Sequence, residues 1–569
     1  MSGPPQRAEA GDEDCGSMKR AYRIMGLIPL AFILAAFVLP YGAALSQGLA
    51  AGHGAEVFSG EQLGSLWRVL IFTLSQAFFS MLLALALGLP GAWLLGSGSF
   101  KGRRLMKALS SIPFAMPSIL VVLGFVLFLG NSGWLNNLIL MVQGKSPESA
   151  APLSILYKPS AIILAHGFYN FPLVMRLTGD GIRDARRLYA PAAASLGASP
   201  FKTALTVLFP VILPSLAAAC LLAFLYSFTS FAVVLVLGGG PGATTLPVEI
   251  YRYARISLDY RSAGILALLE TIIAAIVFVA YLYFERKARA YGGEKSGRTQ
   301  GSFQAEAIGR PLSKIWGGLY GFCMLILVLG PLLSIPAESF LYRPTRSALP
   351  AFSLHHWAAL GGRVIPALIR SLILAALAAS FSLVLALLAA WAARMSEKKS
   401  AFHTLIRALS AAPLASSGIV LGLGWLILYG RDHSRTLLAV ILVHGISALP
   451  FAFNSIYEGF ASISGNTINA AAAAGAGPVK TLLTVAMPIS LGRLRSAWGF
   501  AAAISLGELN ALFMLGFDSW ETLPLLIYRA VGAYRFGTAC AAGSLLLLCS
   551  TGAFLLSDSS FFRKVQDAD

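Results

Sequence analysis

The chain has 569 residues, of which 57% are hydrophobic and 12% carry a charge. Soluble globular domains carry about 25% charged residues, so this composition excludes an ordinary soluble protein and favours one that crosses a membrane many times. The formal net charge of +18 would suit a nucleic-acid-binding protein, but the placement of the basic residues argues against that class.

Apolar runs long enough to cross the ~30 Å hydrocarbon core as helices recur along the whole chain. We therefore predict an all-α polytopic membrane protein with about twelve transmembrane helices. They are expected near residues 24–45, 69–95, 108–129, 159–178, 211–237, 263–284, 314–335, 368–393, 405–429, 436–457, 491–516 and 537–557. The first run follows a basic stretch, as a signal peptide does, but the spans behind it indicate an uncleaved helix. Residues 1–18 are expected to be a disordered cytoplasmic tail.

Basic residues gather in every second connection between these spans. With the N-terminus inside, the cytoplasmic segments include Lys19, Arg20, Lys101, Arg103, Arg104, Arg183, Arg186, Arg187, Lys202, Arg286, Lys287, Lys398, Lys399, Arg563 and Lys564. Cytoplasmic loops of membrane proteins carry an excess of Lys and Arg, so both termini are predicted to be cytoplasmic. Topology thus explains the charge, and nucleic acid is not an expected partner.

Four landmarks occur twice in the same order, which indicates an internal duplication. Three of them pair Leu109 to Pro113 with Leu409 to Pro413, His166-Gly167 with His444-Gly445, and Thr245-Leu-Pro247 with Thr522-Leu-Pro524. We predict two halves of six spans each, residues 19–284 and 314–569, joined by a basic cytoplasmic linker, 285–313. An even number of spans in the first half makes the two repeats parallel, with the transport pathway between them.

The fourth landmark is a loop with polar residues between two apolar runs, predicted at 180–210 in the first half and at 458–490 in the second. Pro191-Ala-Ala-Ala-Ser-Leu-Gly197-Ala-Ser-Pro200 corresponds to Asn469-Ala-Ala-Ala-Ala-Ala-Gly475-Ala-Gly-Pro478, and Pro210 corresponds to Pro488. The Ala-rich part favours a short helix, the Gly permits a turn and the Pro suits the start of a second helix. A plain amphipathic connector is the alternative, but two copies in register favour a docking surface.

These loops resemble the EAA loop of ABC importer permeases. The resemblance rests on Ala192, Ala193, Gly197, Pro200 and Pro210, and on their counterparts Ala470, Ala471, Gly475, Pro478 and Pro488. It implies the type I importer permease fold, a coupling helix from each half seated on one of two cytoplasmic ATPase subunits, an external or periplasmic substrate-binding protein, and a place in a bacterial inner membrane. Both copies depart from the family pattern at its first position, where Pro191 and Asn469 replace a frequent Glu.

The same loops are not expected to bind ATP themselves. Gly197 and Gly475 each precede a Lys-Thr pair, as in a P-loop, but Phe201 and Val479 stand where that motif requires Gly. The chain is therefore expected to hold no cofactor, and ATP and Mg²⁺ are expected on the partner ATPase. Five scattered cysteines indicate neither a disulfide framework nor a metal site.

The fused double permease resembles the thiamine and ferric-iron branch of the family. The run Ser505-Leu-Gly-Glu508-Leu-Asn510 and the segments Gly238 to Pro241 and Thr522 to Pro524 resemble thiamine permeases more than ferric ones. Thiamine is the preferred substrate and ferric iron the alternative. An ion-gradient-driven secondary transporter is the rival from another class, although its membrane carboxylates would be unusually sparse, and a membrane-embedded enzyme is disfavoured because no catalytic spacing is found.

Polar residues inside apolar spans usually face a cavity or a partner. The candidates for the substrate pathway are Glu508, Asn510, Ser505, Thr229, Ser230, His166 and His444. Glu508 is predicted in the middle of a span, where a carboxylate would favour a cation. Hydrogen bonding between helices is the alternative for Glu508 and for the paired histidines.

Overall fold

The structure is a computed structural model that describes residues 22–50, 60–97, 103, 106, 116–146, 149–238, 240–291, 311–343, 351–397, 400–430, 433–516 and 520–557. Contacts between residues divide the chain into two compact units, each described here by itself. Unit 1 contains residues 1–46, 365–522 and 548–569, and unit 2 contains residues 47–364 and 523–547. The predicted tail (1–18) and most of the predicted linker (285–313) lie outside the described residues.

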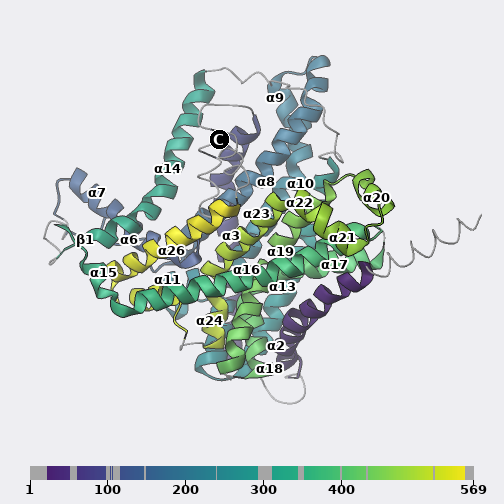
Figure 1. The fold of residues 1–569 in the computed structure, drawn as a ribbon. Coiled ribbons are helices and arrows are strands. Elements are labelled where there is room, and N and C mark those ends of the chain that lie inside the picture. Colours follow the sequence, from purple (N-terminus) through teal and green to yellow (C-terminus); the bar gives the residue numbers. More distant parts are fainter. Residues whose placement is uncertain are drawn as a thin grey trace, which may run out of the picture. The chain divides into compact units, whose positions relative to one another are not determined.

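Helices dominate both units (Figure 1). The helices that lie mainly in unit 2 are α3 (Gly60–Ser97), α6 (Ser118–Leu129), α7 (Trp134–Val142), α8 (Pro159–Ser195), α9 (Pro200–Lys202), α10 (Phe209–Phe228), α11 (Ala232–Leu237), α12 (Leu246–Tyr251), α13 (Tyr260–Tyr291), α14 (Pro311–Phe340), α15 (His355–Ala359) and α25 (Leu523–Gly532). Those of unit 1 are α16 (Val364–Met395), α17 (Ala401–Ala411), α18 (Gly418–Tyr429), α19 (His433–Ala461), α20 (Gly465–Ala473), α21 (Pro478–Thr481), α22 (Met487–Ile489), α23 (Leu491–Gly507) and α24 (Asn510–Leu515).

Two further helices, α2 (Leu39–Ala50) and α26 (Phe536–Ser557), run across a unit boundary, and α16 has its first residue, Val364, in unit 2. The strands β1 (Leu341–Tyr342) and β2 (Ala351–Phe352) pair antiparallel, with Leu341 opposite Phe352. The predicted all-α polytopic class is thereby confirmed.

Among the described residues, nine helices are long and apolar enough to cross a membrane. A tenth candidate is the pair 401–415 and 418–429, bent by 102° at its break. The predicted spans at 159–178 and 491–516 are not among these ten. The first belongs to α8, which continues into the charged stretch Asp180 to Arg187, and the second is divided between α23 and α24. The count of twelve therefore stays a prediction.

The compact units do not follow the predicted halves, because the first helix of each half belongs to the other half's unit. The helix Tyr22–Leu49 lies for most of its length in unit 1, and α14 lies in unit 2. The backbone of each of these two helices packs closely against a glycine of another helix in the same unit. A Cβ at Gly124 of α6 would lie 2.7 Å from the Pro331 carbonyl oxygen of α14, and Gly424 of α18 meets the Pro40 carbonyl in the same way. Small residues allow such close helix approach in membranes.

Candidate functional site: the repeated loops and helix breaks

The first repeated loop begins where α8 ends. Gly197 has a φ of +77°, its N–H donates to the Ala194 carbonyl (2.9 Å), and the Ala198 N–H donates to the Ala193 carbonyl (3.0 Å). This is the glycine-based arrangement that closes a helix C-terminus, and it needs the left-handed backbone that glycine adopts without strain. The Ser199 hydroxyl then accepts from the Lys202 N–H and caps α9, with Pro200 at its start.

The second loop repeats the hydrogen bonds of this left-handed turn. Gly475 has a φ of +75°, its N–H donates to the Ala472 carbonyl (2.9 Å), and the Ala476 N–H donates to the Ala471 carbonyl (3.0 Å). Pro478 again begins the next helix, α21. Two differences separate the copies. Gly477 stands where Ser199 caps α9, so α21 has no side-chain cap. The Ala-rich part of the second is the separate short helix α20, as predicted, whereas that of the first is the last part of the 37-residue α8.

Each loop returns to the membrane through a π-helical turn. The turn covers Thr203–Leu208 in the first copy and Leu482–Ala486 in the second. It precedes Pro210 in one copy and Pro488 in the other, near the start of the following helix. Proline has no N–H to donate and its ring clashes with the carbonyl four residues back, so a regular α-helical turn is disfavoured at both places. Such turns are frequent at functional positions.

The tips of both loops present apolar side chains to the outside of the chain. Phe201 is 78% exposed and Leu205 59% in the first loop, and their counterparts Val479 and Leu483 are 53% and 55% exposed in the second. Ala192 and Ala470 are exposed as well. No atom lies within 4 Å of a Cβ built at Gly197 or Gly475. Each loop therefore offers a small convex surface with room for another backbone.

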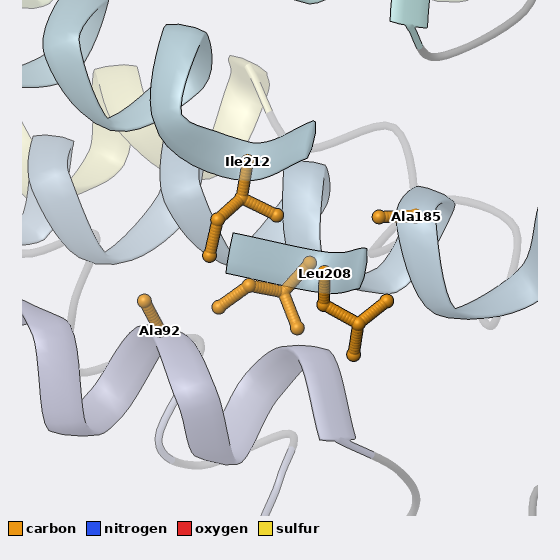
Figure 2. Packing of buried hydrophobic residues seen from close by; sticks show 5 residues of the cluster. Ala92, Ala185, Leu208 and Ile212 are labelled. Carbon is orange, nitrogen blue, oxygen red and sulfur yellow. The ribbon is translucent and has the colours of Figure 1, made fainter. Parts of the chain in front are cut away.

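A buried cluster ties the first loop to the membrane helices. Figure 2 shows Leu208, from the π-helical turn, and Ile212 of α10 packed between Ala92 of α3 and Ala185 of α8. Ile182 of α8 completes the cluster, and all five residues are less than 5% exposed. Because close-packed interiors transmit strain, a push on the loop would move α3, α8 and α10 together.

The helix after each loop is broken at matching places. In unit 2, α10 ends at Phe228 and α11 begins at Ala232, with the half-buried Thr229 and Ser230 between them. In unit 1, α23 ends at Gly507 and α24 begins at Asn510. Glu508 lies in this break, rather than inside a continuous span as predicted. Its Oε1 accepts from the Asn510 N–H (2.9 Å), and a Cβ at Gly418 of α18 would lie 3.3 Å from that oxygen.

The paired histidines are buried and hydrogen-bonded within their own units. His444 Nδ1 lies 2.9 Å from the Ser505 hydroxyl, so the structure brings together two of the predicted pathway residues. His166 Nδ1 lies 3.0 Å from Oε1 of Gln76. Neither Nε2 atom has a hydrogen-bond partner among the described residues.

Sequence reasoning missed the rest of the polar cluster around His166. The Gln76 side-chain amide donates to the Ser227 carbonyl (2.9 Å), and the Asn170 amide donates to the Ser227 hydroxyl (3.0 Å). Gln76 and Asn170 are polar residues inside apolar runs, and Ser227 occupies the same place relative to the first loop as Ser505 does to the second. These two signals were available. Within the described part of the chain, no group of three or more His, Cys, Asp or Glu side chains is arranged to hold a metal.

The sequence is similar to known permeases of transport systems. Residues 88–290 match the family model described as the inner membrane component of binding-protein-dependent transport systems. The thiamine transport system permease protein ThiP of Haemophilus influenzae is 28% identical over 539 residues, covering 92% of this chain and 94% of the relative. ThiP of Escherichia coli is 28% identical over 492 residues, covering 85% and 87%. One chain of the MetNI methionine ABC transporter in an inward-facing conformation is 21% identical, with a TM-score of 0.29, covering 41% of this chain and 99% of that chain.

Proposed function

Because the chain belongs to the inner-membrane permeases of binding-protein-dependent ABC importers, we propose that it carries thiamine or its phosphates into the cytoplasm. The observation that carries the substrate assignment is similarity to thiamine permeases over nearly the full length of both chains. Ferric iron is the alternative substrate. Affinity is expected to reside largely in an external binding protein that delivers the substrate.

The proposed mechanism is alternating access driven by two copies of a separate cytoplasmic ATPase. Each ATPase would receive one loop, through the exposed Ala192 and Gly197 in the first copy and Ala470 and Gly475 in the second. Ala193, Ala471 and the four loop prolines would hold each loop in shape. The matched left-handed turns and exposed tips support this proposal, because two identical partner grooves require two equivalent surfaces. ATP and Mg²⁺ would bind to the partners, with both termini of this chain on the same, cytoplasmic side.

The substrate pathway is proposed to pass the helix breaks. Glu508 and Asn510 form one break, and Thr229 and Ser230 form the other. Irregular backbone within a membrane is tolerated where it lines a cavity or is buried in protein, and broken helices supply substrate sites in many transporters. Glu508 would favour a cation in transit. His166, His444 and Ser505 would act behind the breaks, holding the helices by hydrogen bonds.

Uptake of radiolabelled thiamine, with labelled ferric iron in parallel, tests the proposal in cells with and without this gene. Loss of thiamine uptake on deletion, restored by the wild-type gene, is the expected result. If deletion abolishes iron uptake alone, the proposal of an ATP-driven permease would stand, but the substrate would be ferric iron and not thiamine. Uptake that persists after ATP depletion but collapses with the proton or sodium gradient would overturn the ATP-driven mechanism.

A further inference from the structure

We propose that one anionic phospholipid of the cytoplasmic leaflet binds in an apolar groove of unit 2, with its acyl chains along α3 and α14 and its phosphate at the cytoplasmic end. The groove has a volume of about 810 Å³. Its walls include Leu89 and Trp93 of α3, Phe201 and Leu205 of the first loop, and Leu319 and Cys323 of α14. The proposal is independent of which substrate the permease carries.

Most walls of this groove belong to helices that are apolar enough to cross a membrane. They come from the candidate spans 64–96, 200–228 and 317–340, and Ile182 of α8 adds one further residue. Trp93 is 37% exposed and Leu319 is 52% exposed, although both lie on helices apolar enough to be immersed in a bilayer. The Tyr320 hydroxyl at the groove donates to the Leu87 carbonyl (2.7 Å), so it presents no unmet polar group. In a membrane, acyl chains are the apolar molecules present at high concentration, and they fill such a groove at no cost in polar desolvation.

Three cations lie on the chain beside residues that line the groove, and we assign them to its cytoplasmic end. Arg186 lies one helical turn beyond Ile182, which lines the groove, and residues so spaced share a helix face. Lys202 directly follows Phe201 and is exposed. Arg103 donates from its guanidinium to the Leu95 carbonyl (3.0 Å), and its buried Nε has no acceptor among the described residues.

The positive charges of Arg186 and Lys202 are not balanced by a nearby carboxylate of the described residues. Neither Arg186 nor Lys202 forms an ion pair with a carboxylate of the described residues, since Asp180 and Asp184 both pair with Arg183. Burial lowers the pKa of Arg186, so a neighbouring anion would offset the cost of holding that charge. Basic pockets between membrane helices on the cytoplasmic side suit anionic lipid headgroups, and guanidinium groups pair well with phosphate. A zwitterionic lipid would satisfy this cluster less well.

The matching place in unit 1 is filled by protein. Trp391, the repeat counterpart of Trp93, is fully buried. Tyr22 lies against its ring at 6.3 Å between centroids and Phe460 at 5.4 Å, both edge to face. The neighbouring Gly26 is packed against Phe402 and Ala392. The lipid is therefore assigned to unit 2, where Phe201 and Leu205 belong both to the groove and to the first loop. A bound lipid would support that loop from the membrane side.

Photo-crosslinking of the purified full-length chain in lipid nanodiscs tests this proposal. The probes are phosphatidylglycerol and phosphatidylcholine, each with a diazirine on one acyl chain. We expect at least fivefold more crosslinking by phosphatidylglycerol to the α14 segment that contains Leu319 and Cys323. Leu205→Trp should reduce that crosslink at least fivefold by filling the groove. Its matched control is Leu483→Trp, a similarly exposed leucine in the second loop, which should leave the yield unchanged.

A second variant tests whether the cations bind the lipid headgroup. Arg186→Gln with Lys202→Gln should abolish the preference for phosphatidylglycerol while keeping the crosslink to α14. Equal yields from the two lipids in the wild-type protein would overturn the anionic assignment. An unchanged yield in Leu205→Trp, or crosslinks spread evenly over all apolar helices, would overturn the groove. A second polypeptide retained in the groove, detected by native mass spectrometry, would do so as well. None of these readouts depends on transport.

Discussion

Gly424 of α18 lies directly against the backbone carbonyl of Pro40, on the first helix of the chain. The Trp425 indole N–H, one residue further on, donates to the Ala36 carbonyl of the same helix (3.1 Å). The approach of the Pro40 backbone leaves no room for a side chain at position 424. The first helix is thus anchored to the unit built mainly from the second half, although the two segments are far apart in sequence.

This contact predicts a strong effect of the smallest possible substitution. In Gly424→Ala, the new methyl group would meet backbone, which cannot turn away, and overpacking of this kind costs about 1–3 kcal/mol. The gain in helix propensity, about 1 kcal/mol, would offset only part of that. We expect a lower melting temperature in detergent. Gly321→Ala in α14, where nothing lies within 4 Å of the new atom, should raise it or leave it unchanged. Equal stability of both variants would show that the contact is unimportant.

The left-handed turns of the two loops predict a loss of coupling without a loss of fold. Gly197→Val with Gly475→Val places branched side chains in a conformation that costs about 1–2 kcal/mol per residue, on surfaces that would meet another backbone. We expect normal insertion and at least about tenfold lower thiamine uptake, since 1.4 kcal/mol is tenfold.

Gly144→Val is the matched control for the loop variants. Gly144 has a φ of +65° and the same open surroundings, but it lies between α7 and α8 and outside both loops. It should carry the same local strain as either single loop substitution and retain uptake. If the double loop variant transports as well as this control does, the loops are not the ATPase-docking surface.

The predictability of each feature depends on how local its cause is. The turns at Gly197 and Gly475 follow from nearby residues, and the spacing of Gly and Pro predicted them. The all-helical membrane fold follows from hydrophobicity and was confirmed. The break at Glu508 was missed because a two-residue interruption barely changes the hydrophobicity of the run. The seating of Pro40 on Gly424 was missed because it depends on packing between distant segments. The bond between Gln76 and His166 has the same kind of cause.

For Glu508, we expect that the effect of the charge on uptake can be separated from the effect of the hydrogen bond on stability. Glu508→Gln keeps an oxygen that can accept from the Asn510 N–H (2.9 Å in the wild type), so the break should keep its shape and the protein its melting temperature. If the carboxylate favours a cation in the pathway, thiamine uptake should fall by about tenfold, the equivalent of 1.4 kcal/mol. Glu508→Ala removes both functions and should lower stability as well, by about 0.5–1.5 kcal/mol for the lost hydrogen bond to the Asn510 N–H. Full uptake by the Gln variant would exclude a role for the charge.

Because the two buried histidines have different hydrogen-bond partners, we expect the equivalent serine substitutions in the two units to lower stability by different amounts. Ser505→Ala removes the hydroxyl that His444 Nδ1 contacts at 2.9 Å, and a buried polar group left without its partner costs about 1–3 kcal/mol. Ser227→Ala removes the repeat counterpart, but His166 keeps its contact with Gln76 (3.0 Å). The bonds lost are the one from the Asn170 amide and the one that the Ser227 hydroxyl donates to the Ala223 carbonyl (2.9 Å), which leave no histidine nitrogen without its partner.

Melting temperatures of the two single variants and of Ser505→Ala with His444→Leu measure this difference. Ser505→Ala should be the less stable single variant. Adding His444→Leu should recover part of the lost stability, because the double variant no longer contains a buried ring nitrogen without a hydrogen-bond partner. If the double variant is less stable than Ser505→Ala, His444 makes favourable contacts other than the one to Ser505. A pathway role would then be indicated by a loss of uptake that exceeds the loss of folded protein.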